Sequence, residues 1–406
     1  MRVLVIAPSP PFPVTYGAAA RTFNIVKELS KQHKVWLLTY SNNGNANSHS
    51  TEEYGRNAEV GKLDPLAEYC EIIPPVARSV PSRLRKRLHQ LTSAFGLASY
   101  ARREFYREEM QNAINEVIRD KRIDAVHVES SFMGYFKFGD SLLKVLDEHN
   151  VEYQLLYRVF KTERNPLRKL YNFSEWIKFR RDEIAIARRF DTVFYPSEVD
   201  ARIMRPHLGN RVAVLPNGVD TNFFSPREGA ERPNTLLFFG AMNYYPNVDA
   251  MLYFANLIWP RIKQRAPEAT LNIMGPNPPK IVRDLAAIDG IGVLGKVDDP
   301  RSLIASATVV VVPLRIGSGT RLKVLEALAM GKAIVSTSVG VEGIDITDKE
   351  VVLMADAPSK FADCVVETLN DSRLRAAMGR NGRALVESRY SWSQVCQPIQ
   401  EVYRDA

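Results

Sequence analysis

A chain of 406 residues exceeds the size at which one hydrophobic core usually stops growing, so two domains are expected. Its 45% hydrophobic and 25% charged residues exclude a disordered or fibrous chain. The formal net charge of +8 permits a polyanionic partner, but no recognition motif for nucleic acid accompanies it, so nucleic acid is not an expected partner.

Short apolar strands alternate with amphipathic helices from the first residues onward. Residues 3–7 and 35–39 are predicted strands on either side of a helix near 20–31, which is the βαβ pattern of a parallel sheet. The polar stretch 41–51 is rich in turn residues and is an expected loop. Further strands of this half are predicted at 123–128, 144–147, 192–195 and 212–215.

The alternation restarts after Pro226 and predicts a second sheet. Its strands are expected at 235–239, 269–274, 291–294, 308–312, 333–336 and 351–354. The fold class is therefore α/β, with two Rossmann-like doubly wound domains facing a central cleft, where ligands of open sheets bind. We expect domains over 1–222 and 223–388, and a terminal segment, 389–406, whose helix at 391–403 packs back on the first domain.

The sequence predicts a cytoplasmic protein. Its three cysteines lie far apart, without the spacing of a zinc site or a disulfide framework. Only five apolar residues follow Arg2, too few for a signal-peptide core, and no run approaches 18 apolar residues.

One basic stretch suggests a second kind of partner. Between Arg83 and Arg103 there are six Arg or Lys residues and no acid, with leucines such as Leu84 and Leu88 interleaved. This composition suits a helical segment lying on an anionic membrane surface, which would make the protein peripheral on the inner face. A solvated helical hairpin fits the composition equally well.

The segment 309–337 carries the densest chemical signal. A buried strand ends at Pro313, a loop with two glycines follows, and a helix is predicted to start near Thr320, which is a suitable N-cap. Arg321 and Lys323 then fall in the first turn, where the helix dipole disfavours cations. An anion bound at this helix start would explain them, since Gly317 and Gly319 let a phosphate approach the backbone.

Glu326 follows one turn later between apolar neighbours. A carboxylate in such surroundings needs hydrogen-bond donors, and the adjacent hydroxyls of a ribose supply two of them. The alternative for both charged residues is an ion pair between Lys323 and Glu326.

These residues resemble the retaining glycosyltransferases of family 4, which have the GT-B fold, and the resemblance covers nearly the full length. It is carried by the pattern GSG-x-R-x-K-x-LEA at 317–327. In that family, such segments carry two glutamates eight positions apart, and the second binds the donor ribose. Glu326 matches the second, whereas Ser318 stands in place of the first, which contacts the donor sugar.

The resemblance implies further donor contacts. Gly240 aligns after the first strand of the second domain, but the Arg and Lys that commonly follow there are missing. Arg315, Arg321 and Lys323 are the candidates to hold the diphosphate instead, because an Arg fork suits it well. Backbone groups near Val297 are expected to meet the base, and Gly319 and Thr320 offer further N–H groups.

In the first domain, the segment 15–23 resembles the family's glycine-containing loop, with Gly17 near the donor and Tyr16 on the acceptor side. His149 matches a histidine that faces the donor sugar and is the expected catalytic group. Glu129 is a candidate for acceptor contact. Without the resemblance, a glycine at position 17 is more often only a turn residue, and a histidine such as His149 is more often a hydrogen-bonded structural residue.

The implied reaction moves a sugar from a UDP- or GDP-type donor to a glycan or lipid-linked acceptor, with retention, in cell-surface polysaccharide or glycoconjugate synthesis. No obligatory metal or cofactor is implied, because cationic side chains and a helix start can meet the phosphate charge. A nucleotide-sugar epimerase or hydrolase on the same fold and a non-catalytic nucleotide-sugar-binding partner are the alternatives. A dinucleotide-dependent enzyme is disfavoured, since no GxGxxG follows the first strand.

Overall fold

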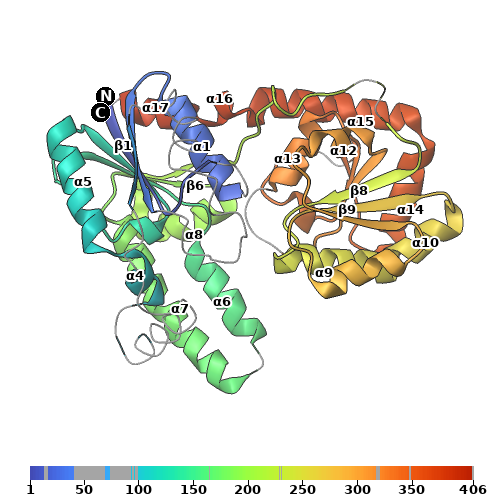
Figure 1. Cartoon of the computed structure of the whole chain (residues 1–406), viewed down its shortest axis with the longest axis horizontal. Coiled ribbons are helices and arrows are strands. Elements are labelled where there is room, and N and C mark those ends of the chain that lie inside the picture. The colour runs from blue at the N-terminus through green and yellow to red at the C-terminus, as the bar shows by residue number, and fades with distance from the viewer. Residues whose placement is uncertain are drawn as a thin grey trace, which may run out of the picture. The chain divides into compact units, whose positions relative to one another are not determined.

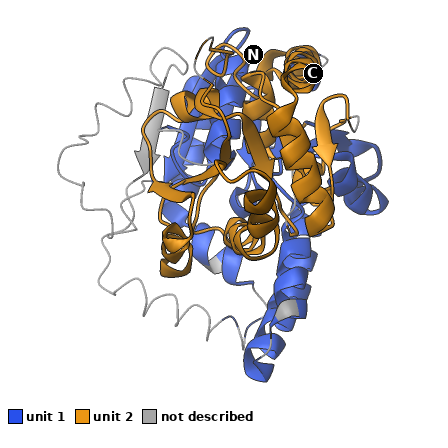
Figure 2. Cartoon of the chain, turned by 90° about the vertical axis from the view of Figure 1, so that its right-hand side faces the viewer, with its two compact units in different colours: residues 1–215, 396–406 blue, residues 216–395 orange. Residues whose placement is uncertain are grey.

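The computed structural model describes residues 1–12, 17–40, 93, 96, 99–163, 165–227, 229, 231–316, 321–346 and 349–404, with backbone alone at 69–73, Arg103 and Thr162. The expected loop at 41–51 and most of the basic stretch 83–103 lie outside these residues. The chain forms two compact units (Figure 2). Unit 1 comprises Met1–Leu215 and Cys396–Ala406, and unit 2 comprises Pro216–Val395, so the chain passes from unit 1 to unit 2 seven residues before the expected boundary at 222.

Unit 1 is built on a seven-stranded parallel sheet with the order β3-β2-β1-β4-β5-β6-β7 (Figure 1). The strand β1 is buried from Val3 to Ala7, because a parallel sheet is covered on both faces and selects continuous apolar runs. The strands are β1 (Arg2–Ala7), β2 (Lys34–Tyr40), β3 (Tyr69–Ile73), β4 (Ala125–Glu129), β5 (Leu143–Asp147), β6 (Thr192–Tyr195) and β7 (Val212–Val214).

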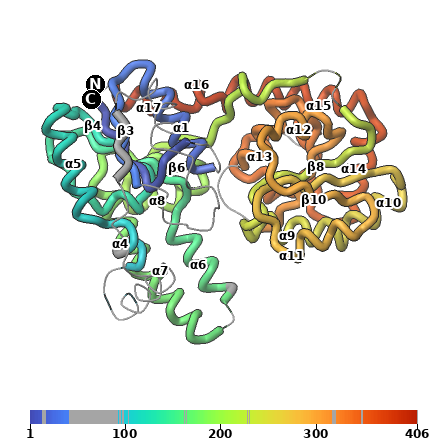
Figure 3. The backbone as a smooth tube through the Cα atoms, in the orientation of Figure 1, coloured from blue at the N-terminus to red at the C-terminus, as the bar shows by residue number. Residues whose placement is uncertain are grey.

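The helices of unit 1 include a long hairpin. In Figures 1 and 3, α6 and α7 pack against each other and extend away from the sheet of this unit. Asn165 caps α7 by accepting from the backbone N–H groups of Leu167 and Arg168, and Pro166 occupies the first turn. The helices are α1 (Gly17–Leu29), α4 (Tyr100–Phe105), α5 (Glu108–Lys121), α6 (Glu152–Thr162), α7 (Pro166–Ala187), α8 (Glu198–Leu208) and α17 (Gln397–Arg404).

Unit 2 contains a six-stranded parallel sheet with the order β10-β9-β8-β11-β12-β13. Its core is one continuous apolar cluster in which the four valines of β11 are fully buried. The strands are β8 (Thr235–Phe239), β9 (Thr270–Met274), β10 (Ile291–Gly295), β11 (Val309–Val312), β12 (Ile334–Ser336) and β13 (Val352–Met354). The α-helices are α9 (Tyr245–Tyr253), α10 (Trp259–Arg265), α11 (Lys280–Arg283), α12 (Arg301–Ser306), α13 (Leu322–Ala329), α14 (Pro358–Asn370), α15 (Ser372–Leu385) and α16 (Trp392–Val395). The α/β class and the two doubly wound sheets are therefore as predicted.

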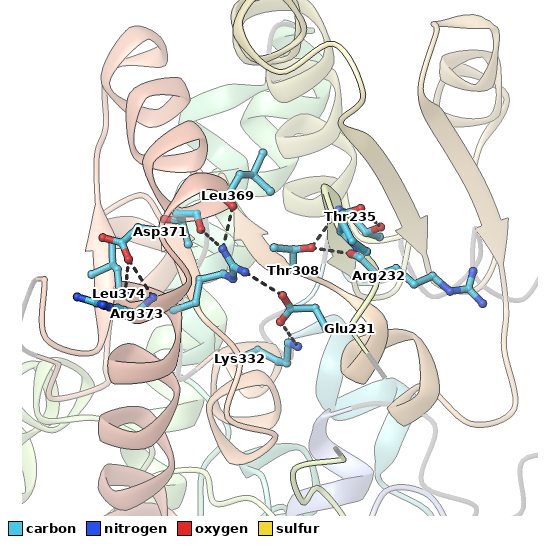
Figure 4. A network of polar contacts seen from close by, with 12 residues as sticks. Glu231, Arg232, Thr235, Thr308, Lys332, Leu369, Asp371, Arg373 and Leu374 are labelled. Carbon is cyan, nitrogen blue, oxygen red and sulfur yellow. Dashed lines mark hydrogen bonds and ion pairs between the residues drawn. The ribbon is translucent and has the colours of Figure 1, made fainter. Parts of the chain in front are cut away.

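A polar network ties several of these elements together (Figure 4). Glu231 accepts from Arg375 and Lys332, at 3.1 and 3.4 Å. Thr308, just before β11, donates to the carbonyl of Arg232 and accepts from the N–H of Thr235. Burial lowers the pKa of Lys332, so the charged form of its amine depends on its two acceptors, Glu231 and the carbonyl of Ala305.

The final helical stretch differs from its prediction as one helix at 391–403. It is interrupted between α16 and α17, since Pro398 lacks an N–H and disfavours helical geometry in the residue before it. The helix α1 also begins at Gly17 rather than near residue 20. Within the part of the chain that the structure describes, no helix has both the length and the apolar character needed to cross a bilayer.

Candidate functional site

Three of the predicted donor residues, Gly240, Arg315 and Lys323, lie near the point where the strand order of unit 2 reverses. Both β9 and β10 lie on one side of β8, while β11, β12 and β13 lie on the other. Chain segments leaving β8 and β11 therefore diverge, and they leave room at the carboxyl ends of these two strands. Gly240 follows β8 directly, and the loop carrying Arg315 follows β11.

Lys323 lies against the end of β8. Its Nζ donates to Oδ1 of Asn247 at 2.7 Å and lies 4.2 Å from the ring centre of Phe238. A Cβ atom at Gly240 would come within 2.8 Å of the same Nζ, and Gly240 also has a φ of +147°. A glycine is therefore required beside the amine. Burial and the neighbouring Arg321 lower the pKa of Lys323 to about 7, although Glu326 acts in the opposite direction.

Glu326 lies one turn further along α13 and is partly buried. Burial raises the pKa of its carboxyl to about 7, and only the charge of Lys323 opposes this shift. Among the described residues, the carboxylate has no hydrogen-bond donor. A partly buried carboxylate without donors is costly, so this side chain is suited to a ligand that brings hydroxyl groups.

The two arginines proposed for the diphosphate both have acidic neighbours. Arg315 forms a bidentate pair with Asp249, at 2.6 and 3.0 Å, and lies 4.5 Å from the ring centre of Tyr253. The buried side chain of Arg321 lies 3.4 Å from the carbonyl of Val339 and 3.7 Å from Glu342. Lys323 is therefore the cation that lies against Gly240, while both arginines are held by other groups.

The remaining donor candidates are placed only in part. Gly317, Ser318, Gly319 and Thr320 lie outside the described residues, as does Tyr16. The helix α13 begins at Leu322, and Arg321 is its N-cap without a side-chain cap, so the N-cap lies one residue later than the predicted Thr320 and Arg321 is not in the first turn. Val297 is partly buried two residues beyond β10, and Gly17 is exposed at the first residue of α1.

In unit 1, Glu129 is the centre of a buried polar cluster at the carboxyl ends of β4 and β5. Its Oε2 accepts from His149 Nε2 at 2.9 Å and from Thr22 Oγ1 at 3.0 Å. Although burial alone would raise it, the pKa of Glu129 is held well below its usual value by His127 and His149. The structure thus brings Glu129 and His149 together, and Glu129 has no exposed surface of its own.

The cluster continues to the last helix of the chain. His127 Nε2 lies 3.5 Å from Glu129 Oε1, and its Nδ1 lies 3.0 Å from the hydroxyl of Tyr403. Either atom of the Tyr403–His127 contact can be the donor, and His127 Nε2 and Glu129 Oε1 lie side by side without forming a hydrogen bond. The same carboxylate holds the Nε2 proton of His149, which leaves Nδ1 of His149 as its acceptor atom.

A buried ion pair borders this cluster. Arg21 donates to both oxygens of Asp147 at 2.6 Å and to the carbonyl of Leu215 at 2.9 Å. Within the described residues, His127, Glu129 and Asp147 each bring one potential metal-ligand atom within 4.8 Å of the others. Asp147 already accepts the Arg21 fork, and Glu129 accepts from His149 and Thr22, so protein groups meet the charge of these carboxylates.

Sequence reasoning missed Arg21, His127, Asp147 and Tyr403. A signal was present for two of them, because Arg21 lies in the same loop-to-helix segment as Gly17, and Asp147 ends a predicted strand two residues before His149. A charged residue at the carboxyl end of a buried parallel strand needs an ionic or hydrogen-bonding partner, so this pattern indicates a candidate site residue. No local signal joins His127 to Tyr403, which is 276 positions away.

Comparisons with known proteins match both units. The family model described as Glycosyltransferase Family 4 matches residues 15–223, and the model described as Glycosyl transferases group 1 matches residues 233–371. A phosphatidyl-myo-inositol mannosyltransferase of Mycobacterium tuberculosis is 30% identical over 225 residues, which are 51% of this chain and 57% of the relative. The chain therefore spans little more than half the length of this curated relative.

Solved structures share the fold over nearly the full length. Sucrose-phosphate synthase from Thermosynechococcus elongatus has a TM-score of 0.69 at 15% identity, covering 100% of this chain and 99% of its own. HepE of Anabaena, in complex with UDP and glucose, has a TM-score of 0.65 at 13% identity and covers 99% of both chains. These proteins have the GT-B architecture, so the likeness establishes that fold for the two doubly wound units.

Proposed function

This chain belongs to glycosyltransferase family 4, and we propose from this premise that it transfers a sugar from a nucleotide diphosphate sugar to an acceptor hydroxyl. The anomeric configuration is retained, and the donor carries UDP or GDP. The solved relative that holds UDP and glucose supports such a donor. The proposed reaction has no obligatory metal or cofactor.

The observation that carries this proposal is the carboxylate of Glu326 beside Lys323, which has no hydrogen-bond donor among the residues that the structure describes. A ribose offers two adjacent hydroxyl donors to one carboxylate, while the diphosphate offers negative charge to the amine one turn earlier. Both groups have a pKa of about 7 without ligand, because burial disfavours their charged forms. The binding of a diphosphate would raise the pKa of Lys323 again, so the amine takes up a proton as the donor binds.

The other donor contacts follow from the same arrangement. Gly240, a proposed donor contact, lets Lys323 approach the end of β8. The family resemblance supports backbone N–H groups of Gly317, Ser318, Gly319 and Thr320 as contacts to phosphate or sugar oxygens. The neighbouring Arg315 and Arg321 add positive charge to the diphosphate region while Arg315 stays paired with Asp249 and Arg321 stays beside the carbonyl of Val339. Backbone groups near Val297 meet the base.

On the first unit, His149 is the proposed catalytic group, with Gly17 near the donor and Tyr16 on the acceptor side. Glu129 orients the imidazole through the Nε2 bond and so acts on the acceptor through His149. The leaving diphosphate is stabilised electrostatically, and its own oxygen helps to deprotonate the acceptor hydroxyl.

The proposed acceptor is a glycan or a lipid-linked saccharide in cell-surface polysaccharide or glycoconjugate synthesis, met at the cytoplasmic face of the membrane. The name of the mycobacterial relative, which acts on a phosphatidylinositol, supports a lipid-linked acceptor. The basic stretch 83–103 supports contact with an anionic surface.

Donor binding by a Glu326→Gln variant tests the proposal. Thermal shifts with UDP-glucose, UDP-N-acetylglucosamine and GDP-mannose first identify the base, because a ligand at 100 times its Kd stabilises the native state by about 2.7 kcal/mol. We expect Glu326→Gln to raise the donor Kd by tenfold or more, since hydrogen bonds to a charged group contribute roughly 1.5–3 kcal/mol each.

The matched control is Glu268→Gln, which removes an exposed carboxylate of the same unit. Equal donor affinity in the Glu326 variant, the control and the wild type would reject the site. Product analysis with and without a saccharide acceptor then separates a transferase from a nucleotide-sugar hydrolase or epimerase. A transferase releases free nucleotide in proportion to glycoside formed, whereas the alternatives turn over the donor without acceptor.

A further inference from the structure

The outer half of the α6–α7 hairpin exposes a set of large apolar side chains that the proposed transfer reaction does not use. Leu167 and Leu170 are 79% and 67% exposed, which is unusual for leucines in a folded unit. Leu167, Leu170, Phe173 and Ile177 follow one another at intervals of three or four residues, so they form one stripe along α7. The exposed members on the hairpin are Val159, Leu167, Leu170, Phe173 and Ile177.

The charges on the same hairpin are segregated. The exposed charged residues of 152–187 are all basic, and none of the described acids in this range is exposed. Two cationic side chains lie along aromatic rings, with Lys161 Nζ 4.8 Å from the centre of Tyr157 and Lys169 Nζ 5.6 Å from that of Phe160. The exposed basic residues are Arg158, Lys161, Arg168, Lys169, Arg180 and Arg181.

Two acids of the hairpin, Glu175 and Glu183, are buried and used in packing. Glu183 accepts from the backbone N–H groups of Glu152 and Tyr153, at 3.0 and 2.8 Å. Glu175 accepts from the N–H of Tyr100 and pairs with Lys178. Glu163 accepts from the N–H of Asn165, and Asp182 accepts from Ser99 and pairs with Arg181. No exposed acid therefore remains among the described residues of the hairpin, and its outer surface is both basic and apolar.

We propose that this outer surface of the α6–α7 hairpin, formed by the five apolar and six basic residues named above, docks on an anionic lipid membrane. A basic and apolar helix surface gains from two parts of such a membrane, the lipid phosphates and the acyl boundary. A nucleic acid would bind the basic residues through its phosphates but would leave the exposed leucines in water. Ser93 and Tyr100 of the chain's own stretch 83–103 bond to Glu175 and Lys178 of α7, at the inward side of the hairpin. The six basic residues of that stretch would be repelled by the basic outer surface, so like charge disfavours the stretch as its cover.

This inference extends the proposed function, because an enzyme acting on a lipid-linked acceptor would meet it at the docked face. The test uses the full chain and two kinds of vesicle, phosphatidylcholine alone and phosphatidylcholine mixed with phosphatidylglycerol. We expect the wild type to sediment with the anionic vesicles, and the binding to weaken at high salt as exposed charges are screened.

Two paired variants separate the apolar and the charged contributions. Leu167→Gln with Leu170→Gln, and Arg168→Gln with Lys169→Gln, should each lower binding to anionic vesicles by about tenfold or more. The controls on unit 2 are Leu257→Gln with Ile281→Gln, and Arg373→Gln with Arg380→Gln, which also remove exposed side chains. These controls should bind the vesicles as the wild type does.

Two further readouts keep the proposal apart from the transferase assignment. The thermal shift given by the nucleotide sugar should be the same in all hairpin variants. If the wild type shows no such shift, the proposed transferase function is contradicted but the proposed docking surface is not. A wild type that ignores anionic vesicles at low salt overturns the docking surface. So does a leucine variant that keeps vesicle binding but unfolds at a lower temperature or changes its sedimentation, which would mean that protein covers the stripe.

Discussion

Tyr403 connects the last helix of the chain to the candidate catalytic histidine through side chains alone. Its hydroxyl contacts His127, His127 lies against Glu129, and Glu129 holds His149. Every group in this series except His149 is fully or almost fully buried, so water does not replace a missing partner. The tautomer of each imidazole is therefore determined by its neighbour.

A Tyr403→Phe variant tests this coupling at a single atom. The phenyl ring keeps its packing against the rings of His33 and His127, but the hydroxyl hydrogen-bonded to His127 Nδ1 is lost, which costs about 1 kcal/mol. We expect nitrogen NMR to show an altered tautomer of His127 and a shifted signal of His149. Tyr253→Phe, which removes a hydroxyl that donates to the backbone carbonyl of Asp356 in unit 2, should leave the signals of both histidines unchanged. Unaltered imidazole signals in Tyr403→Phe would refute the series.

At the scale of elements, α6 depends on α7 for its first turn. Val151 at the capping position provides no side-chain cap, and Glu183 from α7 accepts the N–H groups instead. Burial raises the pKa of Glu183 well above its ordinary value of 4.5, and burial raises that of Glu148 to about 8. The two carboxyl groups also repel each other, so both gain protons on folding.

This protonation predicts a pH dependence for the stability of unit 1. An acid with a raised pKa stabilises the folded state fully below its unfolded pKa of about 4.5, and the contribution is lost as the pH rises toward 8. Each such group changes the free energy of unfolding by up to about 1.4 kcal/mol per pH unit. Glu148→Gln should flatten this decline between pH 5 and 8, as measured by hydrogen exchange in β4 and β5. Glu116→Gln, at an exposed position on α5, should decline like the wild type. If the stability of the two variants declined with pH in the same way, Glu148 would be excluded as a source of the pH dependence.

At the scale of the whole molecule, both ends of the chain contribute to unit 1. The segment that follows α16 returns to this unit, where Cys396, Ile399 and Tyr403 are buried. Unit 2 is formed by one continuous segment, Pro216–Val395. The stability of unit 1 thus depends on residues that are synthesised after all of unit 2.

Truncation after Val395 should therefore destabilise one unit and not the other. Fully burying an aliphatic or aromatic side chain contributes about 1.5–3 kcal/mol, so losing Ile399 and Tyr403 removes roughly 3–6 kcal/mol from unit 1. Hydrogen exchange read by mass spectrometry should show faster exchange in β1 and β4 and unchanged exchange in β8 and β11. Glu401→Gln, on the exposed side of α17, is the control. Equally faster exchange in both sheets, or unchanged exchange in both, would contradict the division of the chain into these two units.

Much of the fold could be predicted because its elements are determined by neighbours close in the sequence. The runs at 3–7 and 309–312 are continuously apolar, and only a strand covered on both faces accommodates such runs in a parallel sheet. Turn residues and helical periodicity marked where strands and helices alternate. The break at Pro398 was equally local, and the prediction of one helix there overlooked it. The strand β3 was missed, because its central Glu71 interrupts an already short apolar run.

The sequence by itself determined the α/β class, the two doubly wound sheets and the helix that carries Lys323 and Glu326. Only the tertiary structure decided which charged groups meet, since Arg21 and Asp147 are 126 positions apart and Arg315 and Asp249 are 66 apart. Local conformation depends on steric preferences and hydrogen bonds within a few residues. A buried charge instead takes the partner that strand order and helix packing bring within reach, and no periodicity in the chain records that choice.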